Sequence, residues 1–361
     1  MTRRERLHRL YFHEEMDRPA VFNRTGYPDN DPSYDRTRAY LAERSELKEY
    51  WPVHHLIEPP PAEGRREPYS EAFERHITIV HTPKGDLRST FLVSLKGQPG
   101  MAEEYLIKTP EDAERYLSLP LAKIRGEVGT FFEADRAMGD RGIVDIGFGI
   151  NPAGDVVQLL GSDTFAMMSL THRELLHVLC QRRLEIHLAV LRFCLDRGIG
   201  PYFSTAGQEY ITPPLHGPRD FDDFNVRYDK PTFDEIHNAG GRVHVHCHGS
   251  VKKVIGGFGA MGADVLHPFE APPMGDITPR EAKAAARGRL SLEGNIQIAD
   301  MYECTPEQIR QQTASLIGDA FGDHRGLCVC PTASPYIRGE GDRFFSRCKA
   351  MVNAVLERKG A

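Results

Sequence analysis

Three histidines at alternate positions are the residues of this chain best suited to chemistry by type and spacing: His244, His246 and His248. They stand in the segment Gly241-Arg-Val-His-Val-His-Cys-His-Gly249, whose alternation predicts a β-strand. Alternate side chains of a strand share one face, so the three imidazoles are expected to point the same way. Imidazole binds transition metals and transfers protons near neutral pH. A single histidine is more often an ordinary core residue, whereas three on one face favour a functional site.

Further side chains capable of metal binding or acid–base chemistry follow other apolar segments. They are Asn151, Glu209, Glu270, Asn295, and the pair Cys328 and Cys330. Imidazole, carboxylate and thiolate at one place suit a borderline metal such as zinc. Each residue also has a plain structural explanation. A carboxylate can accept from helix-terminal amides or pair with arginine, an asparagine can brace a turn, and a cysteine can be a small buried apolar residue.

Short apolar segments alternate with helical patterns from about residue 140 onward. The expected strands cover 142–149, 200–205, 241–248, 263–268, 290–294 and 327–330. Helices are expected at 171–197, 229–239, 250–261, 278–287 and from 305 onward, and Thr171-His-Arg-Glu174 and Thr305-Pro-Glu-Gln308 have the pattern of a capping box. Strands that alternate with helices indicate right-handed crossovers and a parallel sheet. At least six such units favour a closed (β/α)8 barrel, in which side chains at the strand ends form the site.

Residues 1–120 are more polar and irregular. A first barrel strand is expected at 19–23, and 77–81 and 89–93 alternate like the strands of a hairpin joined around 82–86. Thr109-Pro-Glu-Asp112 has the pattern of a helix start. We therefore expect one domain over 1–361, with the first strand and a cap in 1–120 and the main barrel in 121–361. No G-x-G-x-x-G loop follows an early strand, which argues against a dinucleotide-binding fold.

Composition narrows the class of protein. The chain has 361 residues, 40% of them hydrophobic, and a formal charge of -6 with acids and bases interspersed. This balance argues against nucleic-acid or anionic-membrane partners, and no apolar run has the length of a membrane span. The basic N-terminus is not followed by an apolar signal core, and the seven cysteines are scattered without the spacing of a disulfide framework. A cytoplasmic protein that binds a small molecule is the expectation.

Several segments together resemble the uroporphyrinogen decarboxylase superfamily. They are Gly240-Gly-Arg-Val-His-Val-His-Cys-His-Gly249, Gly262-Ala-Asp-Val-Leu266, Leu292-Glu-Gly-Asn295, Cys304-Thr-Pro-Glu-Gln-Ile309, Thr82-Pro-Lys-Gly-Asp86 and Ile107-Lys-Thr-Pro-Glu-Asp112. The resemblance extends over most of the chain and implies a (β/α)8 barrel. The superfamily has a decarboxylase branch and a branch of methyltransferases that move methyl groups to or from a corrinoid protein. Fold likeness does not settle function, so the site must decide.

The decarboxylase branch has an Arg-Gln-Ala-Gly-Arg stretch after the first strand, whose two arginines grip substrate carboxylates. Here the corresponding stretch is Asn23-Arg-Thr-Gly-Tyr27, in which Arg24 matches the first arginine and the second is missing. A substrate with several carboxylates needs several cationic partners. The resemblance to this branch is therefore partial.

The methyltransferase branch has a His-x-Cys-Gly segment and a distant cysteine that together hold zinc. His246-x-His248-Gly249 stands in register with it, with His248 in the place of the cysteine. Ala333 aligns with the distant cysteine, and Cys330 stands three residues before it. Cys330, Glu270 or Glu209 are the candidates to complete the metal shell. Two imidazoles with a carboxylate would form a harder Lewis acid, suited to polarising the oxygen of a methoxy group.

Three hypotheses follow. The first is a methyltransferase or demethylase, with a divalent metal, expected to be zinc, held by His246, His248, Glu270 and Cys330. The methyl group would pass from an O- or N-methyl substrate to a corrinoid on a separate protein. Catalytic roles are assigned to Glu209, Glu270, Asn295 and Arg24, and a cofactor-binding role to Asn151. The second hypothesis is a metal-free decarboxylase, and the third is a barrel that only binds a small ligand.

Overall fold

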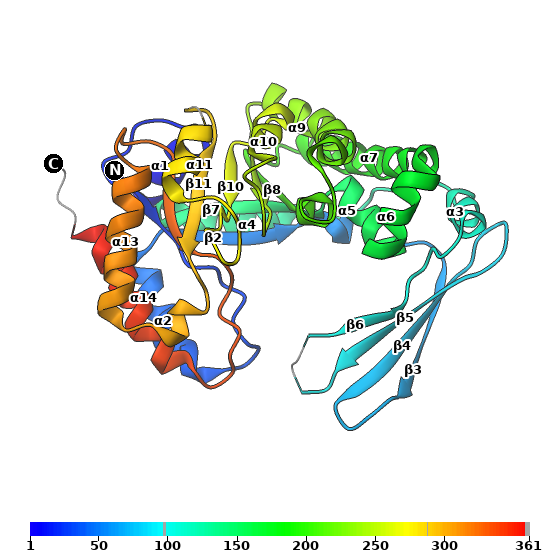
Figure 1. The fold of residues 1–361 in the computed structure, drawn as a ribbon, viewed down its shortest axis with the longest axis horizontal. Helices are drawn as coiled ribbons and strands as arrows, with labels where there is room; N and C mark the ends of the chain where they lie inside the picture. Colours follow the sequence, from blue (N-terminus) through cyan, green and yellow to red (C-terminus); the bar gives the residue numbers. More distant parts are fainter. Residues whose placement is uncertain (97–98, 287, 358–361) are drawn as a thin grey trace.

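Eight parallel strands form one curled sheet in the computed structural model, which describes residues 1–96, 99–286 and 288–357. Around the sheet the order is β1-β12-β11-β10-β9-β8-β7-β2, so neighbours in space follow the chain (Figure 1). The strands are β1 (Ala20–Val21), β2 (Leu47–Pro52), β7 (Gly142–Ile150), β8 (Tyr202–Ala206), β9 (Arg242–His246), β10 (Val265–His267), β11 (Ser291–Ile296) and β12 (Leu327–Pro331). The predicted (β/α)8 barrel is confirmed.

The two ends of this sheet meet at Glu46, immediately before β2. Its backbone N–H donates to the carbonyl of Val21 at 3.0 Å, and its carboxylate accepts from the N–H of Val21 at 2.7 Å. Arg6 and Arg18 pair with the same carboxylate at 2.6 Å and 2.8 Å. A buried side chain thus makes hydrogen bonds that backbone groups make elsewhere in the barrel, and these bonds join β1 to β2.

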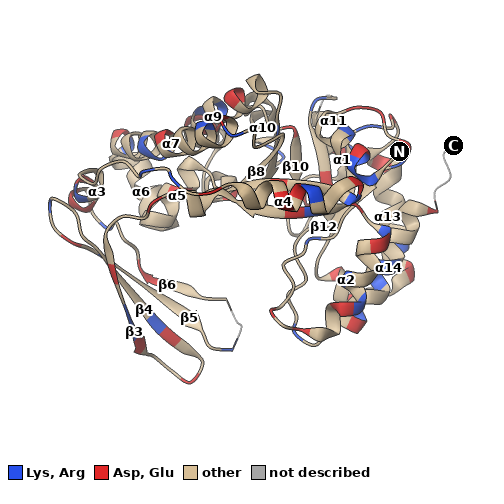
Figure 2. Ribbon diagram, turned by 180° about the vertical axis from the view of Figure 1, so that it is seen from behind, with Lys and Arg blue, Asp and Glu red and all other residues tan. Residues whose placement is uncertain are grey.

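Helices cover the outside of the sheet, and acidic and basic residues are interspersed along them (Figure 2). They are α1 (Arg3–Tyr11), α2 (Asp35–Arg44), α3 (Pro110–Leu117), α4 (Gly129–Met138), α5 (Pro152–Leu160), α6 (Ser162–Thr171), α7 (Arg173–Leu195), α8 (Pro218–Asp220), α9 (Arg227–Asn238), α10 (Ile255–Met261), α11 (Pro279–Ala286), α12 (Asp300–Glu303), α13 (Pro306–Ala320) and α14 (Gly341–Leu356). None of these helices in the described part of the chain has both the length and the apolar character that a membrane span requires.

A separate four-stranded antiparallel sheet is inserted between β2 and β7 and extends away from the barrel in Figure 1. Its strands are β3 (Ala62–Pro68), β4 (Phe73–Val80), β5 (Leu87–Ser94) and β6 (Met101–Glu104). The predicted hairpin is its central pair, β4 and β5. Residues 1–120 hold two barrel strands, β1 and β2, and not one. Apolar residues at the base of the small sheet, among them Val80 and Leu87, pack with α5 and α7.

Two local predictions about helix starts have different outcomes. Thr305 forms the expected capping box with Gln308 at the start of α13. The predicted box at Thr171 is wrong, because Thr171 is the last residue of α6 and its hydroxyl donates to the carbonyl of Met167. A short break at His172 separates two helices where one start was expected. The helix expected to begin at Thr278 was expected to end at Arg287, and this residue lies outside the described residues.

Candidate functional site

Two histidines on neighbouring strands meet at the mouth end of the barrel. His246 ends β9, His267 ends β10, and the two residues are paired in register. Laterally paired residues of a sheet project from the same face, so both rings point into the barrel and stack with their centroids 5.0 Å apart. Their Nδ1 atoms lie 2.8 Å apart.

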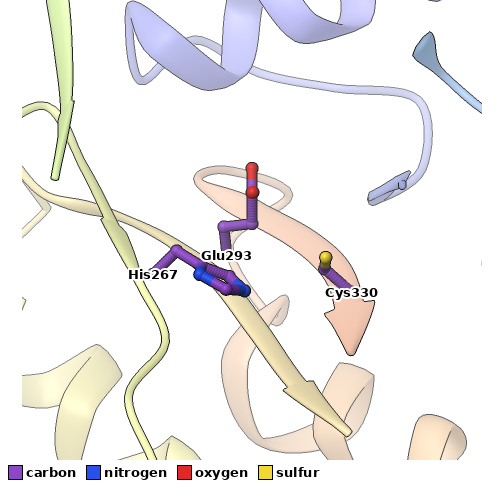
Figure 3. A group of neighbouring side chains, drawn as sticks. All are labelled: His267, Glu293 and Cys330. Carbon is purple, nitrogen blue, oxygen red and sulfur yellow. The ribbon is translucent and has the colours of Figure 1, made fainter. Parts of the chain in front are cut away.

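His267 also belongs to a group of three side chains that could hold a metal ion, with Glu293 on β11 and Cys330 on β12 (Figure 3). One ligand atom from each lies within 4.8 Å of the others, and all three residues are buried. Among the described residues, no other group of three or more histidine, cysteine or carboxylate side chains meets this spacing. Nitrogen, oxygen and sulfur donors on three adjacent strands fit zinc or a similar borderline ion.

Lys48 and His244 surround the carboxylate of Glu293. The Lys48 ammonium forms a buried ion pair with one carboxylate oxygen, and His244 Nε2 lies 3.3 Å from the other. Burial alone would raise the pKa of Glu293, but the charge of Lys48 outweighs it and holds the pKa well below its usual range. Burial likewise lowers the pKa of Lys48, and Glu293 reverses this and raises it. Glu293 is therefore an ionised carboxylate deep in the barrel.

A cavity of about 520 Å³ lies next to this group inside the barrel. Its lining combines aromatic, cationic, acidic and hydroxyl side chains: Phe22, Arg24, Thr25, Gly26, Lys48, Tyr50, Asp145, Gly149, Ile150, Ser204, Thr205, Ala206, His244, His246, Glu293 and Ser334. A pocket of this size with a few converging polar groups suits a small molecule.

Buried titratable groups in the cavity wall and directly behind it have strongly shifted pKa values. Burial, followed by the charge of Arg24, lowers the pKa of His246 to about 2 and that of His267 well below its usual range. Both rings are therefore neutral near pH 7 and have lone pairs. Burial raises the pKa of Asp145, whose Oδ1 atom has no hydrogen-bond partner among the described residues. Perturbed groups that converge on one cavity are typical of functional sites.

The four predicted metal ligands do not come together as one group within the described residues. His248 lies beyond the end of β9, and its Nδ1 is 3.1 Å from Glu270 Oε2, which also accepts from the N–H of Gly249 at 3.0 Å. Burial pushes the pKa of Glu270 up, but these hydrogen bonds, the charge of His248 and a hydrogen bond from Gln297 together bring the pKa below its usual value. Cys330 lies with His267 and Glu293, not with this pair. The metal role of His246, His248, Glu270 and Cys330 stays a prediction.

The other predicted residues lie at or behind the mouth of the barrel. Glu209 accepts from the N–H of Gly207 at 3.1 Å. Burial raises the pKa of Glu209 above its usual value, although backbone hydrogen bonds and the charge of His248 oppose the shift. Asn295 donates to the carbonyl of Phe269 at 2.6 Å. Arg24 lines the cavity, with its Nη1 atom 3.5 Å and 3.4 Å from the two facing histidine Nδ1 atoms. These catalytic roles stay predictions.

Asn151, with a predicted cofactor-binding role, is fully engaged by the protein. Its Oδ1 caps α5 by accepting from the N–H of Gly154 at 2.9 Å. Its amide nitrogen donates to Asn225 at 3.0 Å and to both carboxylate oxygens of Asp229 at 3.1 Å and 3.2 Å. Asn151 is 1% exposed, so these contacts describe a structural role, and the cofactor role stays a prediction.

Sequence reasoning missed His267, Glu293, Lys48 and Asp145. The first two stand inside strands that the sequence did predict, at 263–268 and 290–294, and a polar residue in an otherwise apolar strand was the available signal. Lys48 was missed because the strand that contains it, β2, was not predicted.

The fold and this cavity define the class: a (β/α)8 barrel with polar chemistry at the carboxyl ends of its strands. A family model described as uroporphyrinogen decarboxylase (URO-D) matches residues 93–331, which is more than half of the chain. The chain therefore belongs to the URO-D family. Among curated proteins, no sequence matches it.

Solved structures support the fold. A methyltransferase from Methanosarcina mazei superposes with a TM-score of 0.66 at 14% sequence identity, and the match covers 99% of each chain. An aldolase from Escherichia coli K12 reaches a TM-score of 0.28 at 13% identity, covering 64% of this chain and 87% of that one. A xyloglucanase from Bacteroides ovatus reaches 0.33 at 8% identity, covering 86% and 97%. Only the first of these similarities is high enough to support the fold, and at 14% identity it supports the fold alone.

Proposed function

We propose that this protein is a metal-dependent methyltransferase or demethylase, which moves a methyl group from an O- or N-methyl substrate to a corrinoid carried by a separate protein. The observation that carries the proposal is the set of nitrogen, oxygen and sulfur donors on β10, β11 and β12 beside a cavity of about 520 Å³. The likeness to a methyltransferase over 99% of both chains supports it.

The residues present suit a divalent ion of the zinc type. His267 and His246 are neutral imidazoles, Glu293 is ionised, and Cys330 offers sulfur. A metal held there would supply a Lewis acid that polarises the heteroatom bearing the methyl group. Phe22 and Tyr50 in the cavity wall provide apolar surface for the body of the substrate, and Ser204 and Thr205 provide hydroxyl groups.

The proposed reaction balances without a further oxidant. The bond between the methyl carbon and its heteroatom breaks, and the electron pair stays on the heteroatom, which takes a proton from water. The reduced cobalt of the corrinoid supplies both electrons of the new cobalt–carbon bond, so the cobalt is formally oxidised by two electrons.

The test mixes metal-loaded full-length protein with reduced cobalamin and a panel of methoxylated and N-methylated compounds. Methylcobalamin is followed by its absorbance, and the demethylated product by mass spectrometry. We expect transfer with compounds of one chemical type and loss of transfer after chelation. Transfer that proceeds equally well in chelator-treated protein would contradict the metal dependence.

A decarboxylase is the second candidate, and the position of Arg24 in the cavity wall favours it. Arg24 lines the cavity and pairs with no carboxylate among the described residues, so its guanidinium is free for a substrate carboxylate. Release of carbon dioxide from a carboxylated compound by metal-free protein, without methyl transfer, would replace the first proposal with this one. If the barrel only binds a ligand, neither methylcobalamin nor carbon dioxide should form.

A further inference from the structure

We infer that the metal centre of this chain is formed by His267, Glu293 and Cys330 with His246 as a fourth donor, and that His248 is not a ligand. This assignment rests on the metal dependence proposed above. It keeps His246 but moves the other donors from the His-x-His segment onto the next three strands, β10 to β12.

Strand register brings the four donors together. His246 is opposite His267, and the pairing of Leu266 with Leu292 places Glu293 beside His267 on the next strand. Cys330 follows on β12, two residues beyond the partner of Glu293. Zinc bonds of about 2.0–2.3 Å place ligand atoms about 3–4 Å apart. The spacing of at most 4.8 Å within the group of three is therefore close to that of a zinc shell.

The hydrogen bonds of His267 prepare one of its nitrogens for a metal. Its Nε2 atom lies 3.1 Å from the carbonyl of Pro331, which can only accept, so Nε2 carries the proton. Its Nδ1 atom is then the one with a lone pair. Metal-bound histidines usually donate their other N–H to a carbonyl or carboxylate in this way. His246 Nδ1 is 2.8 Å from this lone pair, so a metal that replaces the shared proton would meet both nitrogens.

His248 is oriented differently. Its ring is nearly perpendicular to that of His246, at 89°, and its Nδ1 is hydrogen-bonded to Glu270. Its side chain is 39% exposed, whereas His267, Glu293 and Cys330 are at most 1% exposed. His248 and Glu270 therefore form a hydrogen-bonded pair at the rim, next to His246 but outside the buried group of His267, Glu293 and Cys330.

Arg24 is a second cation at the proposed centre, in addition to Lys48, which pairs with Glu293. Its Nη1 atom lies 3.5 Å from His246 Nδ1 and 3.4 Å from His267 Nδ1. A guanidinium at this distance repels a divalent ion in a poorly solvated cavity. The arginine therefore weakens metal binding in the free protein, and its removal should strengthen it.

The test is titration of chelator-treated full-length protein with Co²⁺ alone, followed by absorption spectroscopy. Wild type should bind a single equivalent and show a thiolate-to-cobalt charge-transfer band. C330S should lose the band, and E293Q and H267A should lower the affinity by more than about a hundredfold, beyond the loss of an outer-shell partner. C328S is the matched control, because Cys328 is equally buried on the same face of the same strand. Its band should persist.

H248A and E270Q decide between the two ligand sets. Both should keep the band and bind Co²⁺ within about threefold of wild type. Loss of cobalt in H248A but not in E293Q would overturn the inference, as would a band that survives C330S or the absence of any bound cobalt. Far-UV circular dichroism checks that each variant is folded. If cobalt binds as expected but no methyl group is transferred, the proposed function is refuted and this assignment stands. If C330S and E293Q retain the metal and still transfer methyl groups, this assignment is refuted and the proposed function stands.

R24Q tests whether the charge of Arg24 weakens metal binding. We expect its affinity for Co²⁺ to rise about tenfold, because a nearby positive charge is lost. Unchanged or weaker binding in R24Q would overturn the competition between Arg24 and the metal.

Discussion

The Nδ1 atoms of His246 and His267 face each other at 2.8 Å across neighbouring strands of the barrel. His267 holds its proton on Nε2 against the carbonyl of Pro331, so His246 Nδ1 must donate the hydrogen of this contact when no metal is present. His246 Nε2 is then left unprotonated in a residue that lines the cavity. One backbone carbonyl thus sets the tautomers of two rings in succession.

The buried pair of Lys48 and Glu293 should be costly to break on one side only. Lys48→Met leaves an ionised carboxylate without its cation, and we expect the free energy of unfolding to fall by about 3–5 kcal/mol. Urea denaturation measures the change. The double variant Lys48→Met with Glu293→Gln removes both charges and should recover most of the loss. A double variant no more stable than the single one would show that the charge pairing is not the cause.

Closure of the barrel should depend on the charge of Glu46. Glu46→Gln keeps the side-chain oxygen that Val21 uses but loses the ion pairs with Arg6 and Arg18, and we expect a loss of about 3 kcal/mol in urea unfolding. Glu43→Gln is the control, since Glu43 is exposed and pairs only with Arg44 among the described residues. It should change stability by less than about 0.5 kcal/mol. Equal effects of the two variants would contradict the role of Glu46.

Stability should vary with pH through Asp229. Burial raises its pKa to about 7, against the opposing hydrogen bonds from Gln208 and Asn151. The folded state therefore keeps a proton that the unfolded chain has already lost above its own lower pKa. This contribution to stability is complete at low pH and is lost as the pH rises from about 4 through about 7. Asp229→Asn should remove it.

Urea denaturation of wild type and Asp229→Asn at several pH values measures this dependence. The difference in unfolding free energy between the two proteins should change across this interval and be constant above it, with the variant gaining relative to wild type as the pH rises. A constant difference from pH 4 to pH 8 would show that Asp229 does not titrate in this range.

Asn151 should matter for stability and not for binding a cofactor. Asn151→Ala removes the cap of α5 and leaves buried partners unsatisfied, and we expect a loss of about 2 kcal/mol in thermal or urea unfolding. Thr305→Ala removes another helix cap, on the exposed start of α13, and should cost about 1 kcal/mol. Both variants should keep the metal affinity and methyl transfer of wild type. A selective loss of transfer in Asn151→Ala would restore the cofactor role.

The sequence by itself determined the architecture of the barrel because the pattern is local. The six strands expected from residue 142 onward all appear, and the capping box at Thr305 is formed by residues three positions apart. The strand β2 (Leu47–Pro52) escaped prediction since each of its sides carries a charged residue, Lys48 on one and Glu49 on the other, which obscures the alternation. The break at His172 also escaped, because a threonine hydroxyl can bond to the preceding turn as well as cap the following one.

Only the tertiary structure decided which polar residues meet. The sequence marked His246 and Cys330, which do lie at the mouth, because residue type and position at a strand end are visible in one segment. It favoured His248 and Glu270 as partners and overlooked His267 and Glu293, since the neighbours of a side chain in a parallel sheet come from strands tens of residues away. Register between those strands is set by the closure and shear of the whole barrel, and no local segment carries that information.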